Sequence, residues 1–205
     1  MKIYFVRHGE TEWNVKKIFQ GIKNSPLTEL GREQARKLKL KLNNFDFDYF
    51  YSSPLGRAKE TLQILTEDRK NIALKEIEYF REIDMGDMEG VPRDDFEKKY
   101  PKEFHNFWYN GKEYDPIAYK GENFQGVMDR VKKGLEFLVK NHKSTDKILL
   151  VSHGVALEAT FAFIEGRSVE TFEERKVPKN TSLTVVEYKN NKFEILDFSN
   201  TSHLE

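Results

Sequence analysis

Strand-like and helix-like segments alternate along most of this chain, and this alternation limits the fold more than any other feature. Runs of apolar, β-branched or aromatic residues at 2–6, 48–51 and 147–152 are typical of strands, and 72–77 alternates weakly in the same way. Strands that alternate with helices form βαβ units, whose helices cover both faces of a parallel sheet. We therefore expect a three-layer α/β/α fold with a mostly parallel sheet.

Capping residues mark where the expected helices begin. Thr28 is a typical N-cap, and Leu30 opens a set of side chains at helical spacing that runs to about Leu42. Ser53 followed by Pro54 predicts a second N-terminus, with serine at the N-cap and proline at the first helical position. The expected helices span about 28–42, 53–67, 122–142 and 154–164.

Two further segments complete the expected architecture. Residues 182–188 and 192–198 flank Asn190-Asn191 and predict a β-hairpin at the edge of the sheet. Between 84 and 121 the pattern breaks down, and glycine, proline and charged residues mix with many rings. We expect this segment to be an irregular insertion over the active site of a single domain, 1–205. Its rings are Phe96, Tyr100, Phe104, Phe107, Trp108, Tyr109, Tyr114 and Tyr119.

Composition excludes several classes of partner and chemistry. Lys+Arg and Asp+Glu both number 34, so the chain has no net charge and does not resemble a nucleic-acid or membrane-surface protein. The sequence has no cysteine, which rules out disulfides, thiol catalysis and thiolate metal sites. No apolar run approaches the roughly 18 residues of a membrane-spanning helix. We expect a soluble, cytoplasmic protein, and its oligomeric state is not readable from the sequence.

Two histidines occur in the same local setting. His8 follows the strand at 2–6 within Arg7-His8-Gly9, and His153 follows the strand at 147–152 and precedes Gly154. Ligands of open α/β sheets bind at the carboxyl ends of the strands. Arg7 offers a planar fork for phosphate oxygens, and Gly9 is expected to let the backbone approach a ligand. Either histidine alone is more simply explained as structural, but the repeated setting favours a shared anion site.

Arg57 and Glu82 are weaker candidates when each is taken alone. Arg57 falls in the first turn of the helix expected after Ser53, where free backbone N–H groups favour anions. Glu82 follows the strand at 72–77 and is a candidate general acid, although neighbouring carboxylates leave that choice open. A solvent-exposed arginine and a solvated acidic loop are the structural alternatives.

Five ordered blocks of sequence together resemble the histidine phosphatase superfamily, also called the phosphoglycerate mutase-like family. The blocks are Arg7-His8-Gly9-Glu10-Thr11 with Trp13-Asn14 and Gln20-Gly21, Pro26-Leu27-Thr28 with Gly31 and Gln34-Ala35, Ser53-Pro54-Leu55 with Arg57-Ala58 and Thr61, Glu82-Ile83-Asp84 with Gly86 and Glu89-Gly90, and Val151-Ser152-His153-Gly154.

The resemblance implies a role for each candidate. His8 is the expected nucleophile that forms a phosphohistidine, and Arg7, Arg57 and His153 are expected to hold the phosphoryl oxygens. The resemblance also gives Glu82 the task of protonating the leaving alcohol and later deprotonating water. Asn14 and the Gln20-Gly21 loop are expected to line the same pocket. Neither a metal nor a cofactor is expected, because the cations supply the charge. We expect a neutral His8 and a cationic His153.

Three activities are compatible with this resemblance. We expect a phosphatase acting on small phosphomonoesters, because Glu82 is followed by Ile83 and Asp84 rather than by the Arg-His pair typical of mutases. The lysines of the insertion are also offset by acidic residues. A cofactor-dependent phosphoglycerate mutase is the alternative. An inactive protein that binds phosphorylated ligands is a further alternative, although the nucleophile, both arginines and the acid are all present.

The chain departs from the family pattern in two segments. Lys23-Asn24-Ser25 stands where an aspartate is common, and Val155 and Glu158 replace residues that are commonly a glycine or asparagine and an arginine. We expect the departure at Lys23-Asn24-Ser25 to lie outside the phosphate pocket. We expect the change at Glu158 to affect a salt bridge or a substrate contact rather than the phosphohistidine chemistry. His105, His142 and His203 are expected to be structural.

Overall fold

The computed structural model describes residues 1–169 and 177–205, and its centre is a six-stranded sheet of order β3-β2-β4-β1-β5-β6. The strands β3, β2, β4 and β1 are mutually parallel, and β5 and β6 run antiparallel at the other edge. The strands are β1 (Lys2–Arg7), β2 (Tyr49–Ser52), β3 (Leu74–Glu76), β4 (Lys147–Ser152), β5 (Leu183–Lys189) and β6 (Lys192–Asn200).

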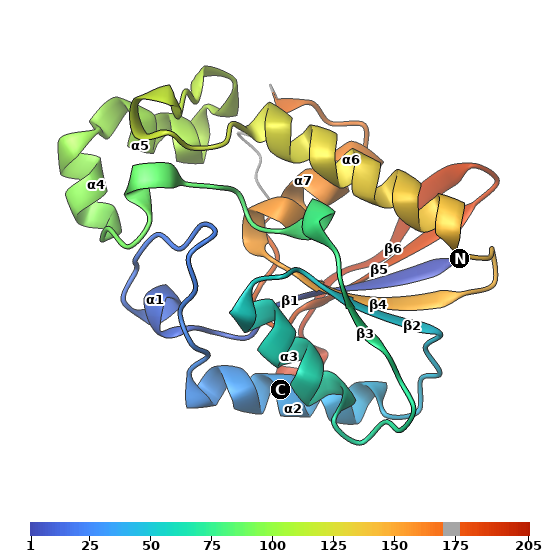
Figure 1. The fold of residues 1–205 in the computed structure, drawn as a ribbon. Coiled ribbons are helices and arrows are strands. Elements are labelled where there is room, and N and C mark those ends of the chain that lie inside the picture. The colour runs from blue at the N-terminus through green and yellow to red at the C-terminus, as the bar shows by residue number, and fades with distance from the viewer. Residues whose placement is uncertain (170–176) are drawn as a thin grey trace.

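Helices cover both faces of the sheet, which confirms the three-layer prediction (Figure 1). The helices α2 and α3 lie on one face, and α6 and α7 lie on the other. Each face has its own apolar core, because the alternating side chains of β1 and β4 point to opposite sides. The helices are α1 (Glu12–Val15), α2 (Glu29–Leu42), α3 (Gly56–Thr66), α4 (Arg93–Lys99), α5 (Pro101–Tyr109), α6 (Phe124–Asn141) and α7 (Gly154–Ile164).

One of the expected helix starts is confirmed, and another is wrong. Thr28 caps α2 as predicted, because its side chain accepts the N–H of Gly31 at 2.9 Å. Leu30, however, is exposed, and the residues of α2 that face the core include Ala35 and Leu38. The helix α3 begins at Gly56, three residues beyond Ser53, which was the predicted N-cap.

The hairpin agrees with its prediction, and the insertion is more regular than predicted. Asn190 and Asn191 both have positive φ angles, at 53° and 60°, as a tight hairpin turn requires.

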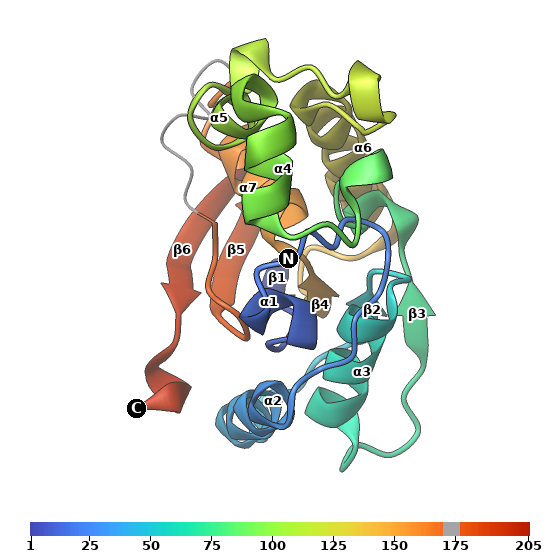
Figure 2. The same cartoon turned by 90° about the vertical axis from the view of Figure 1, so that its left-hand side faces the viewer.

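The insertion contains α4 and α5 (Figure 2). They form because their rings bury one another, with Phe96, Phe107, Tyr114 and Tyr119 all at most 5% exposed. These four rings belong to the same apolar core as Phe5 of β1 and Leu150 of β4.

No helix in the described part of the chain has both the length and the apolar character needed to cross a membrane.

Candidate active site

The two histidines meet because β1 and β4 are adjacent and parallel. Arg7 is paired in register with Ser152, so His8 and His153 leave the sheet side by side at the same edge. Their ring centroids are 5.2 Å apart. The backbone N–H of His8 also donates to the carbonyl of Ser152 at 3.0 Å, which fixes the two strand ends together.

The protonation state of His8 follows from its hydrogen bond and its burial. Its Nδ1 lies 2.7 Å from the carbonyl oxygen of Gly9, and because a carbonyl only accepts, Nδ1 must carry the proton. The Nε2 atom therefore keeps its lone pair. Burial, together with the positive charges of Arg57 and Arg7, holds the pKa of His8 well below 6.5. His8 is therefore a neutral imidazole with Nε2 as its nucleophilic atom.

Gly9 does not have the role that the sequence suggested. A Cβ at this position would lie 2.6 Å from the carbonyl oxygen of Gly31, at the start of α2. The glycine is therefore needed for close packing between this loop and α2 rather than for the approach of a ligand. Its N–H donates to the hydroxyl of Thr61 in α3 at 3.0 Å, which ties the loop to a second helix.

Arg57 is held from behind by backbone carbonyl groups. Its two terminal nitrogens donate to the carbonyl oxygens of Gly21 and Lys23, each at 2.8 Å, and the side chain is 1% exposed. Asn24 accepts the backbone N–H of Arg57 at 2.9 Å, so the departure from the family pattern at 23–25 lies in the support of this arginine. Burial lowers the pKa of Arg57 to about 10, which leaves it charged at neutral pH.

A buried carboxylate fixes the loop that holds Arg57. Glu89 is 6% exposed and accepts the backbone N–H groups of Ile22, Lys23 and Met85 at 2.7 to 3.0 Å. Gly21 has a φ of +54°, and a Cβ there would collide with the Glu89 carboxylate. In the sequence Glu89 is recognisable only as part of the motif that begins at Glu82. Its position in that motif does not indicate which groups its side chain binds.

Arg7 is anchored in the same manner as Arg57. One terminal nitrogen donates to the carbonyl oxygen of Pro178 at 2.7 Å. The Nε atoms of Arg7 and Arg57 are buried and have no hydrogen-bond partner in the described part of the chain. Buried donors are normally satisfied, so two unpaired N–H groups beside a neutral imidazole indicate that an anion binds here.

His153 differs from the prediction in its charge. Its Nε2 lies 2.7 Å from the hydroxyl of Ser53, while Nδ1 is buried with no partner among the described residues. Burial and then the charge of Arg57 hold the pKa of His153 well below 6.5. The expectation of a cationic His153 is therefore wrong for the structure as described, because the ring is buried and lies close to arginine side chains. The Ser53 hydroxyl also accepts the backbone N–H of Leu55, the N-cap residue of α3, at 3.3 Å.

Glu82 lies at the N-terminus of α7. Its carboxylate accepts the backbone N–H groups of Val155 at 3.2 Å and Ala156 at 3.1 Å, as well as that of Ile83 at 2.9 Å. The first-turn N–H groups of a helix have no partner within the helix, and here the carboxyl group of Glu82 accepts two of them. The substitution at Val155 is accommodated because only its backbone N–H contacts Glu82. Glu158, the other departure, is fully buried within α7.

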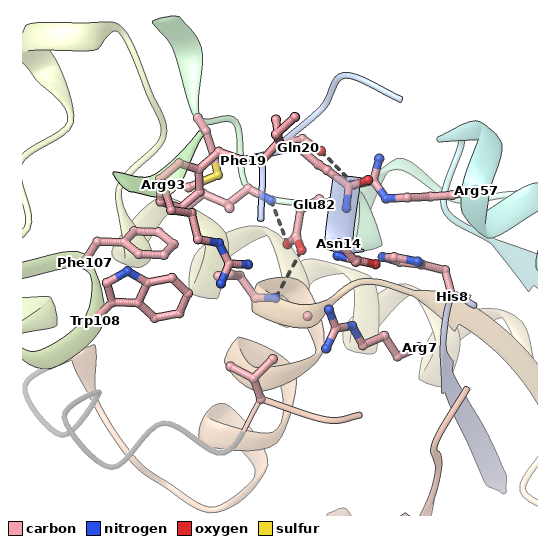
Figure 3. Close-up of a pocket in the computed structure, with 17 residues that line it drawn as sticks. Arg7, His8, Asn14, Phe19, Gln20, Arg57, Glu82, Arg93, Phe107 and Trp108 are labelled. Atoms are coloured by element: carbon pink, nitrogen blue, oxygen red, sulfur yellow. Dashed lines mark hydrogen bonds between the residues drawn. The ribbon is translucent and has the colours of Figure 1, made fainter. Parts of the chain in front are cut away.

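The remaining predicted residues lie on the opposite wall. Asn14 and Gln20 are both tied to Thr11, through the Thr11 N–H to Asn14 Oδ1 at 3.1 Å and Gln20 Nε2 to the Thr11 hydroxyl at 2.8 Å. Asn180 adds a bond to the carbonyl of His8 at 3.0 Å. These contacts hold Asn14, Gln20 and Gly21 against the pocket (Figure 3).

The pocket that these residues line has a volume of about 100 Å³. Seven of the eight predicted site residues border it, and the eighth, His153, has its ring centroid 5.2 Å from that of His8. The predicted residues at the wall are Arg7, His8, Asn14, Gln20, Gly21, Arg57 and Glu82.

Residues that the sequence analysis did not select form the outer part of the pocket. Phe107 and Trp108 come from α5, and Phe19 and Arg93 lie beside them (Figure 3). The insertion therefore covers the site as expected, although only two of its eight rings border the cavity. Arg93 gave no signal in the sequence, because Asp94 and Asp95 follow it directly and offset its charge.

No cluster of three or more His, Cys, Asp or Glu side chains suited to a metal ion occurs within 1–169 and 177–205.

Comparison with known proteins agrees with this geometry. The model of the histidine phosphatase superfamily (branch 1) matches residues 3–201. This chain belongs to the histidine phosphatase superfamily. It is 34% identical to the uncharacterized phosphatase PhoE of Bacillus subtilis, over 98% of this chain and 96% of that one. It is also 32% identical to a 2,3-bisphosphoglycerate-dependent phosphoglycerate mutase of Parvibaculum lavamentivorans, over 82% and 81%.

The fold agrees with that of a solved superfamily structure. Bacillus stearothermophilus YhfR superposes with a TM-score of 0.94 at 33% identity, covering 100% of this chain and 99% of that chain. The membership accounts for the five ordered motifs, and the shared fold accounts for the arrangement of strands that brings those motifs together.

Proposed function

We propose that this protein hydrolyses small phosphomonoesters through a phosphohistidine formed on His8. The observation that carries the proposal is the state of the His8 ring, whose Nδ1 is bonded to the Gly9 carbonyl while the lone pair of Nε2 stays free. Arg7 and Arg57 stand beside it with unpaired Nε–H groups. A neutral nucleophile next to two fixed cations is suited to attack on a phosphate dianion.

In the first step His8 Nε2 attacks phosphorus. The N–P bond forms while the bond from phosphorus to the ester oxygen breaks, and the leaving oxygen takes a proton from the Glu82 carboxyl. The Nδ1–H bond to Gly9 stabilises the positive charge that develops on the ring. Arg7 and Arg57 stabilise the phosphoryl oxygens, whose charge spreads in the transition state.

In the second step water replaces the alcohol. The Glu82 carboxylate takes a proton from the water, whose oxygen attacks phosphorus as the N–P bond breaks, so inorganic phosphate leaves and His8 regains its lone pair. When the Ser53 hydroxyl donates to Nε2 of His153, Nδ1 carries a proton and is free to donate to a phosphoryl oxygen. A bound dianion also favours protonation of His153, which is the cationic state expected from the sequence.

We include independence from metal ions in the proposal. Arginine supplies a permanent charge and a bidentate fork that matches phosphate oxygens. Arg7 and Arg57 occupy the places where a cation would act on the transferring group. Turnover that is unchanged by a chelator and by added Mg²⁺ supports this part, and a requirement for added metal contradicts it.

A phosphoglycerate mutase is the second candidate, and one observation favours it. Arg93 adds a positive charge at the outer end of the pocket, where the sequence had suggested none. The lack of an Arg-His pair after Glu82 favours the phosphatase. Incubation with 3-phosphoglycerate, with and without 2,3-bisphosphoglycerate, separates the two, since a mutase forms 2-phosphoglycerate and a phosphatase releases inorganic phosphate.

The decisive experiment is capture of the intermediate. The wild-type protein mixed with a ³²P-labelled phosphomonoester and quenched in base is expected to carry an acid-labile label, and His8→Ala is expected to lose both label and turnover. His105→Ala, an exposed histidine of α5, is the matched control. A wild-type protein that hydrolyses no phosphomonoester contradicts the proposal and favours a ligand-binding role.

A further inference from the structure

Glu82 is carried by a segment that has no regular secondary structure. Residues 81–85 lie between two short 3-10 helices, Glu78–Phe80 and Gly86–Met88. The carboxyl group of Glu82 nevertheless has to lie within hydrogen-bond reach of the leaving oxygen, because a displacement of about 1 Å can lower a rate by about 10²-fold. Contacts from outside the segment must therefore set the position of its backbone.

The two ends of this segment are fixed by separate contacts. Before the segment, the carbonyl oxygen of Phe80 accepts the hydroxyl of Ser152 at 2.7 Å, which ties it to β4. At the other end, the N–H of Met85 donates to the carboxylate of Glu89 at 3.0 Å. Neither contact involves residues 81–84.

An ion pair between Glu122 and Arg130 lies against this middle part. Nε and Nη2 of Arg130 donate to the two carboxylate oxygens of Glu122 at 2.8 and 3.0 Å, and the two side chains are only 13% and 15% exposed. Arg130 belongs to α6, and Glu122 lies two residues before this helix. A bidentate pair of this kind fixes the direction in which its remaining hydrogen-bonding groups point.

The pair contacts the segment on both sides of Glu82. On one side, Nη1 of Arg130 donates to the carbonyl oxygen of Arg81 at 2.7 Å. On the other side, Oε2 of Glu122 accepts the N–H of Asp84 at 3.3 Å, and the N–H of Glu122 donates to the carbonyl oxygen of Asp84 at 2.7 Å. The backbone before and after the catalytic carboxyl group is therefore bonded to one ion pair.

Arg81 connects the pair to Glu82 itself. Its Nη1 lies 3.4 Å from Oε2 of Glu122 and donates to the carbonyl oxygen of Glu82 at 3.1 Å. The Glu82 side chain borders the pocket (Figure 3), whereas neither Glu122 nor Arg130 is among the described residues that line it. An effect of the pair on proton transfer would therefore act through the position of Glu82.

We propose that the Arg130–Glu122 pair is a positioning element that holds the carboxyl group of Glu82 at the leaving oxygen. The inference rests on the proposed hydrolysis at His8 and adds to it two residues that do not touch the substrate. The carboxyl group also accepts N–H groups from the first turn of α7. Without the pair the backbone on both sides of Glu82 is free to shift, so the carboxyl group delivers its proton to the leaving oxygen less often.

The test compares two substrates whose leaving groups differ in their need for a proton. Phenyl phosphate and p-nitrophenyl phosphate have similar shapes, but phenolate is the poorer leaving group, so the ratio of their kcat/KM values reports on proton transfer from Glu82. Arg130→Met removes the guanidinium and is expected to lower the ratio of phenyl to p-nitrophenyl phosphate at least fivefold. Arg130→Lys keeps the charge without the fork and is expected to give an intermediate ratio. Lys133→Met removes an exposed cation from the same helix and is expected to keep the wild-type ratio.

A double-substitution cycle shows whether the pair acts through Glu82. In the background of Glu82→Gln, which has lost the acid, Arg130→Met is expected to lower the ratio no further. The inhibition constant of inorganic phosphate is expected to stay within twofold of the wild type, because Arg7 and Arg57 still bind the phosphoryl group. Glu122→Gln combined with Arg130→Met leaves no unpaired carboxylate in the fold, so urea unfolding is expected to show a recovery of stability while the ratio stays low.

Each other outcome contradicts the reasoning at a different point. Equal losses of kcat/KM for both substrates, or a phosphate inhibition constant that rises with them, would mean that the pair supports the fold or the phosphate site rather than the acid. A further fall of the ratio in the Glu82→Gln background would mean that Arg130 does not act through Glu82. If urea unfolding shows that Arg130→Met is not folded, Arg130→Lys is decisive, and an unchanged ratio in it overturns the inference. A wild type that hydrolyses neither aryl phosphate overturns the proposed function, whereas an unchanged ratio in folded variants overturns only this inference.

Discussion

The two buried histidines make a quantitative prediction about stability in acid. His8 and His153 both have folded-state pKa values well below 6.5, whereas an unfolded histidine titrates near 6.5. The unfolded chain therefore binds more protons, and stability that is complete above pH 6.5 is lost as the pH falls toward the folded-state values. Between pH 7 and pH 5 each histidine that stays neutral in the fold contributes a loss of about 2 kcal/mol.

The assay is urea unfolding at pH 7 and pH 5 in a buffer without phosphate, because an anion that binds the fold would add stability of its own. His8→Gln is expected to lose about 2 kcal/mol less than the wild type between the two pH values, because one titrating group has been removed. His105→Gln removes an exposed histidine and is the matched control. If both variants show the same loss of unfolding free energy as the wild type, His8 is not held neutral by burial and the argument for its nucleophilic state fails.

Three further substitutions test the supports of the site. Glu82→Gln is expected to lower kcat by about 10²–10⁴-fold for an alkyl phosphate. The loss is expected to be smaller for p-nitrophenyl phosphate, because its leaving group needs no proton. Equal losses of kcat for the two substrates in steady-state assays would contradict acid catalysis. Gly9→Ala is expected to lower the free energy of unfolding by about 1–3 kcal/mol, because its Cβ meets the Gly31 carbonyl at 2.6 Å; an unchanged urea midpoint would contradict that contact. Ser53→Ala leaves Nε2 of His153 without its partner, so urea unfolding should show a loss of about 1–3 kcal/mol. An unchanged midpoint in Ser53→Ala would mean that this contact adds no stability.

The sequence predicted features that depend on local geometry better than features that depend on distant partners. Thr28 caps α2 because its acceptor and donor are three residues apart, and the Asn190-Asn191 turn is equally local. Ser53 carries a similar local signal, yet α3 begins only at Gly56, and the Ser53 hydroxyl bonds both to Leu55 and to His153, which lies 100 residues away. The bond to His153 cannot be predicted from neighbouring residues.

The candidate site divides in the same way. Seven of the eight predicted residues border one pocket, and His8 and His153 meet because they follow adjacent parallel strands. The charge of His153 could not be predicted, since it depends on how deeply the ring is buried beside two arginines. The position of Arg93 at the pocket could not be predicted, because the net charge of the insertion does not show which of its charged side chains point into the pocket. The two helices of the insertion were missed because their buried rings pack against residues that are distant in sequence, such as Phe19, and no local pattern shows such contacts.

The attachment of Arg7 and Arg57 to backbone carbonyl groups affects how fast a substrate arrives. Carbonyl oxygens orient a guanidinium without neutralising its charge. Among the residues that line the pocket, the positive charges of the arginines therefore outnumber the acidic group of Glu82. A positive field within a cleft raises the association rate of anions and weakens as salt shortens its range. We therefore expect phosphate dianions to associate with this pocket faster in dilute than in concentrated salt, although the chain as a whole has no net charge.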